Sequence, residues 1–414
     1  MGNMIGSGVF LLPASLAPYR GVSLLGWIIS AGGSLALALS FARLARLHSS
    51  SGGPYAYTRL AYGDLAGFLV AWGYWISIWT ANAALSVAFV GYLDPFIPSI
   101  VRTPALAALL AIGVVWLLTI VNLFGIRTAG QVQIVTTSLK LMPLVVVGIA
   151  GLIAFDPSHF VMTPISGTGS GHLGKDIMAT ATLSLWAFVG LESATIPAGE
   201  TADAGHTVPR ATMVGTVLTT IVYLVATIGV MSLVEPAALK QSSAPFADAS
   251  RAMFGDRAAA IIALGAAISC FGALNGWVLV VGHLPRTIAL DGLLPSAFAR
   301  LSRRGTPAFA MVVAACLTTA LVGMNYTRGL VGLFTFVILL STLSVLVPYT
   351  FCSLAGIILH RRNPAMAWPA GATLTCAIAF AYALFTIAGA GADVVFWGFL
   401  FLLSGLGVYA IVGR

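Results

Sequence analysis

The sequence predicts an all-α polytopic membrane protein with a single domain, residues 1–414. Of the 414 residues, 59% are hydrophobic and only 8% are charged, whereas about 25% of the residues in a soluble domain are charged. The mean hydropathy is +0.99, and apolar runs of about 20 residues, long enough to cross a bilayer as helices, recur from end to end. A β-barrel would instead show short segments of alternating polarity.

The apolar runs predict twelve spans, with both chain termini on the same side of the membrane. Only short linkers separate the spans, so no soluble domain fits between them. The expected spans are 1–18, 22–45, 65–93, 103–122, 130–155, 177–198, 209–234, 258–285, 306–324, 329–358, 368–389 and 393–413.

The basic residues lie almost entirely between the spans and are unevenly distributed. With the N-terminus placed inside, the inner loops and ends hold twelve Lys/Arg and the outer loops seven. This asymmetry follows the positive-inside rule and explains the formal charge of +8 without a nucleic-acid partner. It predicts a cell inner membrane protein with cytoplasmic termini.

Neither a metal site nor an enzyme active site is expected. The four cysteines fall singly in apolar runs and are interpreted as packing residues. The six histidines are scattered without ligand spacing, so no cofactor is predicted. A channel is disfavoured because no span carries a repeated polar stripe.

Two spans contain glycine-rich interruptions, at Gly6-Ser7-Gly8 and at Gly190. Each is followed by proline seven residues after its first glycine, at Pro13 and Pro197. Matched interruptions in two halves of a chain indicate an inverted-repeat transporter. Unwound backbone at mid-membrane must line a cavity, where helix N-terminal amides can bind a carboxylate and free carbonyls an ammonium group.

Glu192 is the only carboxylate that we place within an apolar span, in the motif Trp186-Ala-Phe-Val-Gly190-Leu-Glu192-Ser193. A charge in the bilayer costs several kcal/mol unless it is paired, neutralised or directed into a cavity. Glu192 is therefore a functional candidate. The alternative is a neutral carboxyl that only hydrogen-bonds a neighbouring helix.

The interrupted segments belong to a set of motifs that resembles the amino acid–polyamine–organocation (APC) superfamily over nearly the whole chain. The likeness is greatest to the basic amino acid and polyamine antiporters, such as the arginine/agmatine antiporters. The motifs are Asn3-Met-Ile-Gly-Ser-Gly-Val-Phe-Leu-Leu-Pro13, Gly52-Gly-Pro-Tyr-Ala-Tyr57, Leu185–Ser193, Val208-Pro-Arg210, Gly276-Trp277, Asp291-Gly-Leu-Leu-Pro295 and Val347-Pro-Tyr349.

The resemblance implies a LeuT-like fold of two inverted five-helix repeats, about 1–155 and 173–360, with additional helices at about 368–414. The first interruption lies only five residues into the chain. The first helix is therefore expected to be truncated at its N-terminus, and a start upstream of Met1 is favoured.

The resemblance also implies the residues of a substrate site. In the family, backbone groups around the first break bind the substrate's α-carboxylate and α-amino group, an aromatic residue closes over it, and others line the side-chain pocket. The corresponding substrate-binding residues are Asn3, Ile5, Ser7, Gly8, Asn82, Trp186, Val189, Trp277 and Ser341. The corresponding gating and proton-coupling residues are Tyr74, Lys140 and Glu192.

Structural alternatives stay open for several of these residues. Trp186 and Trp277 lie near mid-span rather than at the interfaces, where they could stack on a cation or simply pack in the core. Asn82 needs polar partners, which a substrate or a neighbouring helix could supply.

This sequence departs from the arginine/agmatine antiporters in two ways. The third span has Ser77, Ile78 and Leu85 where those antiporters have small and sulfur-bearing residues. Lys140 stands where they lack a lysine, whereas neutral amino acid exchangers and proton-coupled permeases of the superfamily have one. Its ammonium would occupy the sodium position of sodium-coupled relatives, which predicts sodium-independent transport; snorkelling to the interface is the alternative.

The expected function is exchange of a cationic amino acid (arginine, ornithine or lysine) for its decarboxylated amine, by alternating access. The alternative is a sodium-independent neutral amino acid exchanger or a proton-coupled symporter. The expected partners are a small amino acid or amine and the lipid bilayer, with a homodimer possible.

Overall fold

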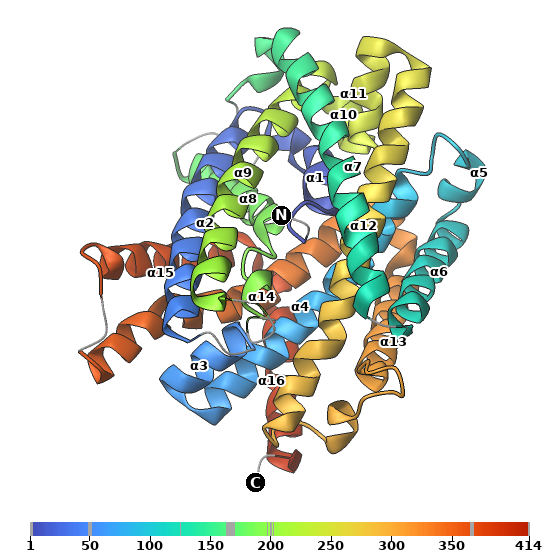
Figure 1. Ribbon diagram of the computed structural model, residues 1–414. Coiled ribbons are helices and arrows are strands. Elements are labelled where there is room, and N and C mark those ends of the chain that lie inside the picture. Colours follow the sequence, from blue (N-terminus) through green and yellow to red (C-terminus); the bar gives the residue numbers. More distant parts are fainter. Residues whose placement is uncertain are drawn as a thin grey trace.

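The computed structural model describes residues 3–48, 52–124, 126–162, 170–196, 198, 201, 203–364 and 368–412, and this part of the chain contains helices and no strand (Figure 1). Each of the twelve expected spans corresponds to a helix. These are α1 (Ser7–Leu16), α2 (Val22–Leu47), α4 (Asp64–Gly91), α6 (Pro104–Leu123), α7 (Ile126–Ile153), α8 (Ser170–Phe188), α9 (Ala204–Leu233), α12 (Asp256–Leu290), α13 (Ala308–Asn325), α14 (Gly329–Arg362), α15 (Ala372–Gly389) and α16 (Ala392–Val412).

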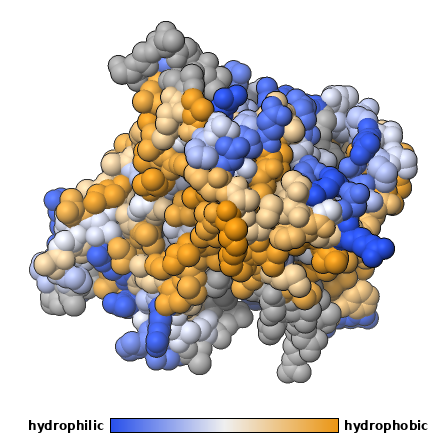
Figure 2. Space-filling model, turned by 90° about the horizontal axis from the view of Figure 1, so that it is seen from above, coloured by the Kyte–Doolittle hydropathy of each residue, from blue (hydrophilic) through white to orange (hydrophobic). Residues whose placement is uncertain are grey.

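Ten helical segments within the described residues are long and apolar enough to cross a membrane. The other two predicted spans correspond to α1, which is short, and α7, whose apolar part is Leu139–Ile153. Many large apolar side chains face outward, including Leu109, Ile153 and Ile411. Hydrophobic residues cover much of the visible surface in Figure 2, while hydrophilic residues gather in patches. A lipid environment accounts for this exposure.

Four short helices occupy linkers where the sequence analysis expected only loops: α3 (Pro54–Tyr62), α5 (Pro98–Val101), α10 (Pro236–Gln241) and α11 (Pro245–Phe254). Each begins with proline, which suits the first helical position because its fixed φ is helical and its missing N–H needs no partner. The longest, α11, buries Phe246, Ala247 and Ala249. The residues themselves therefore carried a start signal for these helices.

Non-helical turns lie at both predicted breaks, one directly before α1 and one directly after α8. Residues 3–6 form a turn that leads into α1 at Ser7. Helix α8 ends at Phe188, a turn follows, and a 3-10 helix, η3, spans Ser193–Thr195. Gly190 in this turn has φ +105°, a conformation that favours glycine. Pro13 lies inside α1, and Pro197 falls outside the described residues.

The two interrupted helices meet in the centre of the bundle (Figure 1). A Cβ on Gly8 would lie 2.8 Å from the Cα of Ala187, so only glycine lets α1 approach α8 this closely. Helix α4 runs through the same centre and is almost entirely buried against α12 and α14. In contrast, α16 lies at the periphery with only 11% of its apolar window buried.

Two of the motifs in the sequence analysis, Gly52–Tyr57 and Asp291–Pro295, are joined in the structure. The phenol of Tyr55 in α3 donates a 2.6 Å hydrogen bond to Asp291, which follows α12. The guanidinium of Arg59 lies 2.8 Å from Asp291 and 2.6 Å from Asp64. Burial and the Asp291 carboxylate raise the pKa of Tyr55 above its ordinary value, so this phenol stays protonated and keeps donating.

Candidate functional site

The central cavity lies where the interrupted ends of α1 and α8 face α4 and α12. It is lined by Asn3, Met4, Gly6, Gly8, Ala81, Leu85, Trp186, Val189 and Trp277. Its volume is about 10 Å³, close to what a single water molecule requires. The walls are therefore closed around the site, and a substrate would have to separate them.

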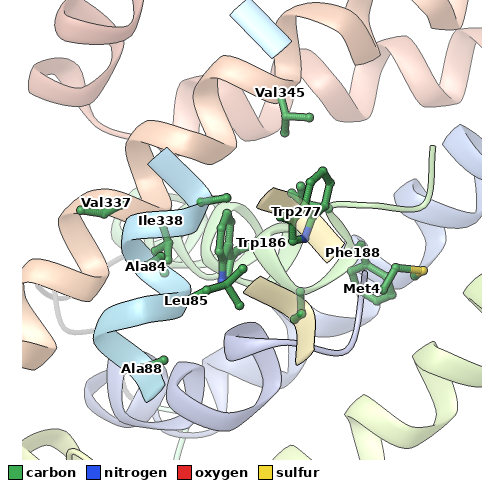
Figure 3. Close-up of a cluster of buried hydrophobic side chains, with 14 of the residues drawn as sticks. Met4, Ala84, Leu85, Ala88, Trp186, Phe188, Trp277, Val337, Ile338 and Val345 are labelled. Atoms are coloured by element: carbon green, nitrogen blue, oxygen red, sulfur yellow. The ribbon is translucent and has the colours of Figure 1, made fainter. Parts of the chain in front are cut away.

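Two buried tryptophans dominate these walls. Trp186, on the last turn of α8, extends beside Leu85 of α4, and Trp277 projects from α12 (Figure 3). The side chains of Trp186 and Trp277 are 6% and 3% exposed, so neither is an interfacial belt residue. The indole Nε1 of Trp186 is buried and has no hydrogen-bond partner among the described residues. This N–H is available to a ligand acceptor.

The carbonyls of the first interruption each accept a hydrogen bond from a different helix. Trp277 Nε1 donates to the Asn3 oxygen at 3.3 Å, and Tyr223 Oη of α9 donates to the Met4 oxygen at 2.5 Å. Lys140 Nζ of α7 donates to the Ile5 oxygen at 2.7 Å. These donors satisfy backbone groups that lipid could not.

The same contacts show where several predicted residues lie relative to the cavity. Asn3 lines the cavity, while the carbonyl of Ile5 points to Lys140 and Ile5 is absent from the lining. Lys140 is fully buried, which excludes snorkelling to an interface. The Ser7 side chain lies outside the described residues, although Ser7 begins α1 and its neighbour Gly8 lines the cavity.

The second interruption holds its own charge-bearing group. Glu192 is fully buried, and its two carboxylate oxygens accept hydrogen bonds from Tyr74 Oη at 2.6 Å and Tyr349 Oη at 2.5 Å. The Gly190 N–H also donates to Oε2 at 3.2 Å. These three donors satisfy the buried oxygens of this one carboxyl. The site thus links α4, the α8 turn and α14.

Tyr349 is a functional candidate that the sequence analysis missed. Its motif, Val347-Pro-Tyr349, was recognised, but no role was assigned to the phenol. No local pattern pairs Tyr349 with Glu192, which is 157 residues away in the chain. Tyr223 was missed for the same reason.

Three further predicted residues differ in whether they line the cavity. Val189 lines it. Asn82 is absent from the lining; it is buried on α4 beside Ala81, and its Oδ1 has no partner among the described residues. Ser341 on α14 is also absent from the lining, and its hydroxyl donates to the Ser77 carbonyl at 2.7 Å. The binding roles of all three stay predictions.

One expectation about charge was wrong. Glu192 is not the only carboxylate buried in a span, because α8 begins earlier than predicted and includes Asp176, which is 4% exposed. The lining residues of the cavity, in contrast, carry no charged side chain. Glu192 and Lys140 are absent from the lining, and each hydrogen-bonds a backbone group of one of the two breaks.

Interrupted helices that meet at a closed central cavity inside a polytopic helical bundle define a secondary transporter. The amino acid permease family model matches residues 1–407. The chain belongs to this family, which confirms the predicted APC membership and places it among transporters rather than enzymes.

Curated relatives lie within the same superfamily. A cadaverine/lysine antiporter of Escherichia coli (strain K12) is 35% identical over 77% of this chain and 71% of its own length. A putative arginine/ornithine antiporter of Bacillus subtilis (strain 168) is 30% identical over 100% of this chain and 95% of its own. The putrescine transporter PotE of Escherichia coli (strain K12) is 28% identical over 100% and 93%.

Proposed function

We propose that this protein exchanges a cationic amino acid (lysine, arginine or ornithine) for its decarboxylated amine by alternating access. The observation that carries the proposal is the meeting of the α1 start and the α8 turn at a cavity walled by Trp186 and Trp277. The N-terminal amides of α1 suit a carboxylate, and nearby carbonyls suit an ammonium group.

The relatives support the cationic substrate class, because the three named above are an antiporter of cadaverine and lysine, a putative antiporter of arginine and ornithine, and a putrescine transporter. The cavity supports it through its aromatic walls. An indole face that is shielded from water attracts a guanidinium or ammonium group by about 2 kcal/mol. The side-chain end of the substrate would stack there without an acidic partner in the lining.

Glu192 would couple this exchange to pH. Its position between Tyr74 and Tyr349 ties the α8 turn to α4 and α14. Protonation would turn one acceptor oxygen into a donor, so at least one of these hydrogen bonds would have to rearrange. Such a change could favour one state of the alternating-access cycle.

A second candidate function is exchange or proton symport of neutral amino acids. Met4, Ala81 and Leu85 form an apolar stretch of the cavity wall, which would suit an uncharged side chain. The contact between Lys140 and the Ile5 carbonyl fits the superfamily branches that carry this lysine. In both candidates the ammonium stands in for sodium, so transport is expected to be independent of a sodium gradient.

The wider arrangement is proposed with the function. The inverted repeats are about 1–155 and 173–360, followed by the helices of 368–414. The protein would lie in the cell inner membrane with cytoplasmic termini and could form a homodimer. The substrate-binding and gating roles given above to the residues around the cavity belong to the same proposal.

Counterflow in proteoliposomes tests the proposed function. Vesicles loaded with unlabelled lysine, arginine or ornithine should accumulate label from the same amino acid and from its amine, with and without sodium outside. Accumulation of only alanine, serine or similar amino acids would favour the second candidate. A requirement for a sodium gradient would overturn both.

A further inference from the structure

The outer face of α2 and α15 contains a groove that shares no lining residue with the central cavity. These two helices pack against each other. Between them lies a groove of about 490 Å³ lined by Ile28, Ile29, Gly32, Gly33, Ile378, Ala381, Tyr382 and Phe385. The lining is almost entirely apolar, so its occupant in the bilayer is a hydrocarbon chain or another apolar helix.

Glycines create the groove. Gly33 lies against Tyr382, because a Cβ on Gly33 would overlap its ring, whereas a Cβ on Gly32 would meet no atom within 4 Å. Gly32 therefore leaves open space on the outer face instead of serving the packing of the two helices. Because Gly32 also lines the groove, this open space adds to the room in it.

The exposed stripe of α2 runs from this groove to two arginines. The residues on the stripe are Ile28, Gly32, Leu35, Leu39, Arg43 and Arg46, which recur every three or four positions and so share one helix face. On α15, Leu374, Ile378, Ala381 and Phe385 form a parallel stripe. The apolar surface is thus continuous with a basic end.

Arg43 is held in place at this end. Its Nη1 donates to the Ala372 carbonyl at 3.2 Å and its Nη2 to the Thr375 hydroxyl at 3.4 Å, both on α15. Other N–H groups of the planar fork are left for an anion. The arginines that form ion pairs among the described residues are Arg59, Arg102 and Arg251. Neither Arg43 nor Arg46 takes part in these pairs.

An aromatic residue marks the level of the membrane surface at this end. The ring of Trp368 stacks on His360 with ring centroids 5.0 Å apart. The Trp368 ring also lies next to Gly356, and Leu44 is adjacent to the same glycine. Tryptophan is enriched at headgroup level. Arg43 and Arg46, next to Leu44 in the chain, therefore lie where a lipid phosphate lies.

The distances fit one lipid. Along α15, Ile378 and Phe385 are six and thirteen residues beyond Ala372, which corresponds to about 9 and 20 Å of helix. Half of a hydrocarbon core is about 15 Å thick. An acyl chain that hangs from a headgroup at Arg43 would therefore pass into the groove.

We propose that α2 and α15 form a binding site for an anionic phospholipid, with its phosphate on Arg43 and Arg46 and an acyl chain in the groove at Gly32. The site is independent of the transported substrate. It would fix α15 and its neighbouring helix α14 against α2 at one membrane surface.

Native mass spectrometry of the full-length protein, released from an equimolar mixture of phosphatidylglycerol, phosphatidylethanolamine and phosphatidylcholine, tests the proposal. The wild type should retain phosphatidylglycerol preferentially. The double variant R43Q/R46Q should bind it about 30-fold more weakly, at about 1 kcal/mol for each arginine. Its matched control, Arg303→Gln in an inner loop, should retain the wild-type preference.

A second variant tests the groove without changing charge. Gly32→Trp fills the open space and should lower phosphatidylglycerol retention at least tenfold, whereas Gly113→Trp, at an equally open glycine on α6, should not. Equal retention in Gly32→Trp and Gly113→Trp would overturn the proposal. Conversion of a dimer to a monomer by Gly32→Trp with unchanged lipid retention would also overturn it, by assigning the groove to a second copy.

Discussion

The two interrupted helices reach the same cavity, but their polar groups are stabilised in opposite ways. At the first interruption, donors from three other helices come to the backbone carbonyls of Asn3, Met4 and Ile5. At the second, the segment supplies its own carboxyl, Glu192, and two tyrosines converge on it. The first segment thus accepts hydrogen bonds from side chains of other helices, whereas the second contributes an acidic side chain to which other helices donate.

This difference suggests a division of labour. At the first interruption, the Lys140 side chain of α7 donates to the Ile5 carbonyl just before α1. The second carries a group that can change its protonation, between α4 and α14. A transporter built this way would hold one broken helix in place and adjust the other. Substitutions at each segment should therefore have different signatures.

The largest effect is expected from Lys140→Met. The substitution leaves the Ile5 carbonyl without its charged donor in a buried site, and a hydrogen bond to a charged group contributes about 1.5–3 kcal/mol. Counterflow should fall by about 100-fold, with no recovery on adding sodium. Lys175→Met, at an exposed position near the start of α8, serves as the control and should transport normally. Full activity of Lys140→Met would show that α1 does not depend on this contact.

Trp186→Leu should have the next largest effect. The substitution keeps an apolar side chain in the wall but removes the indole face and its free N–H, so a cationic substrate should bind about 30-fold more weakly. The measurement is the KM for counterflow, normalised to the amount of folded protein by size-exclusion chromatography. Loss of folded protein in proportion to transport would indicate a packing role instead.

Glu192→Gln should change the pH profile more than the maximal rate. The amide is neutral at every pH, as a protonated carboxyl is, so exchange should stay at the level that the wild type reaches at low pH. Substrate binding, measured by thermal stabilisation, should persist. A variant that follows the wild-type pH profile would leave Glu192 as a structural hydrogen-bonding group.

Local signals in the sequence predicted the fold and the location of the cavity. Glycine weakens a helix wherever it occurs, and the apolar runs fix the spans, so the breaks near Gly6 and Gly190 could be predicted. The donors to these breaks could not, because Tyr223 and Tyr349 look like ordinary aromatic residues until the fold brings them within hydrogen-bond distance. The burial of Asp176 depended on where α8 begins, and helix ends are the least certain part of any sequence-based assignment.

The smallest effects, and the sharpest comparison, come from the two tyrosines that the sequence could not assign. Tyr349→Phe removes a donor from the carboxyl of Glu192, and Tyr223→Phe removes one from the neutral carbonyl of Met4. A hydrogen bond to a charged group contributes about 1.5–3 kcal/mol and a neutral one about 1 kcal/mol. Thermal unfolding in detergent should therefore show the greater loss for Tyr349→Phe at neutral pH. That excess loss of stability should disappear at low pH, once Glu192 is protonated, whereas the loss for Tyr223→Phe should not change.

Equal losses at both pH values would mean that Glu192 is neutral throughout. The contrast between the two interruptions would then be one of geometry rather than of charge.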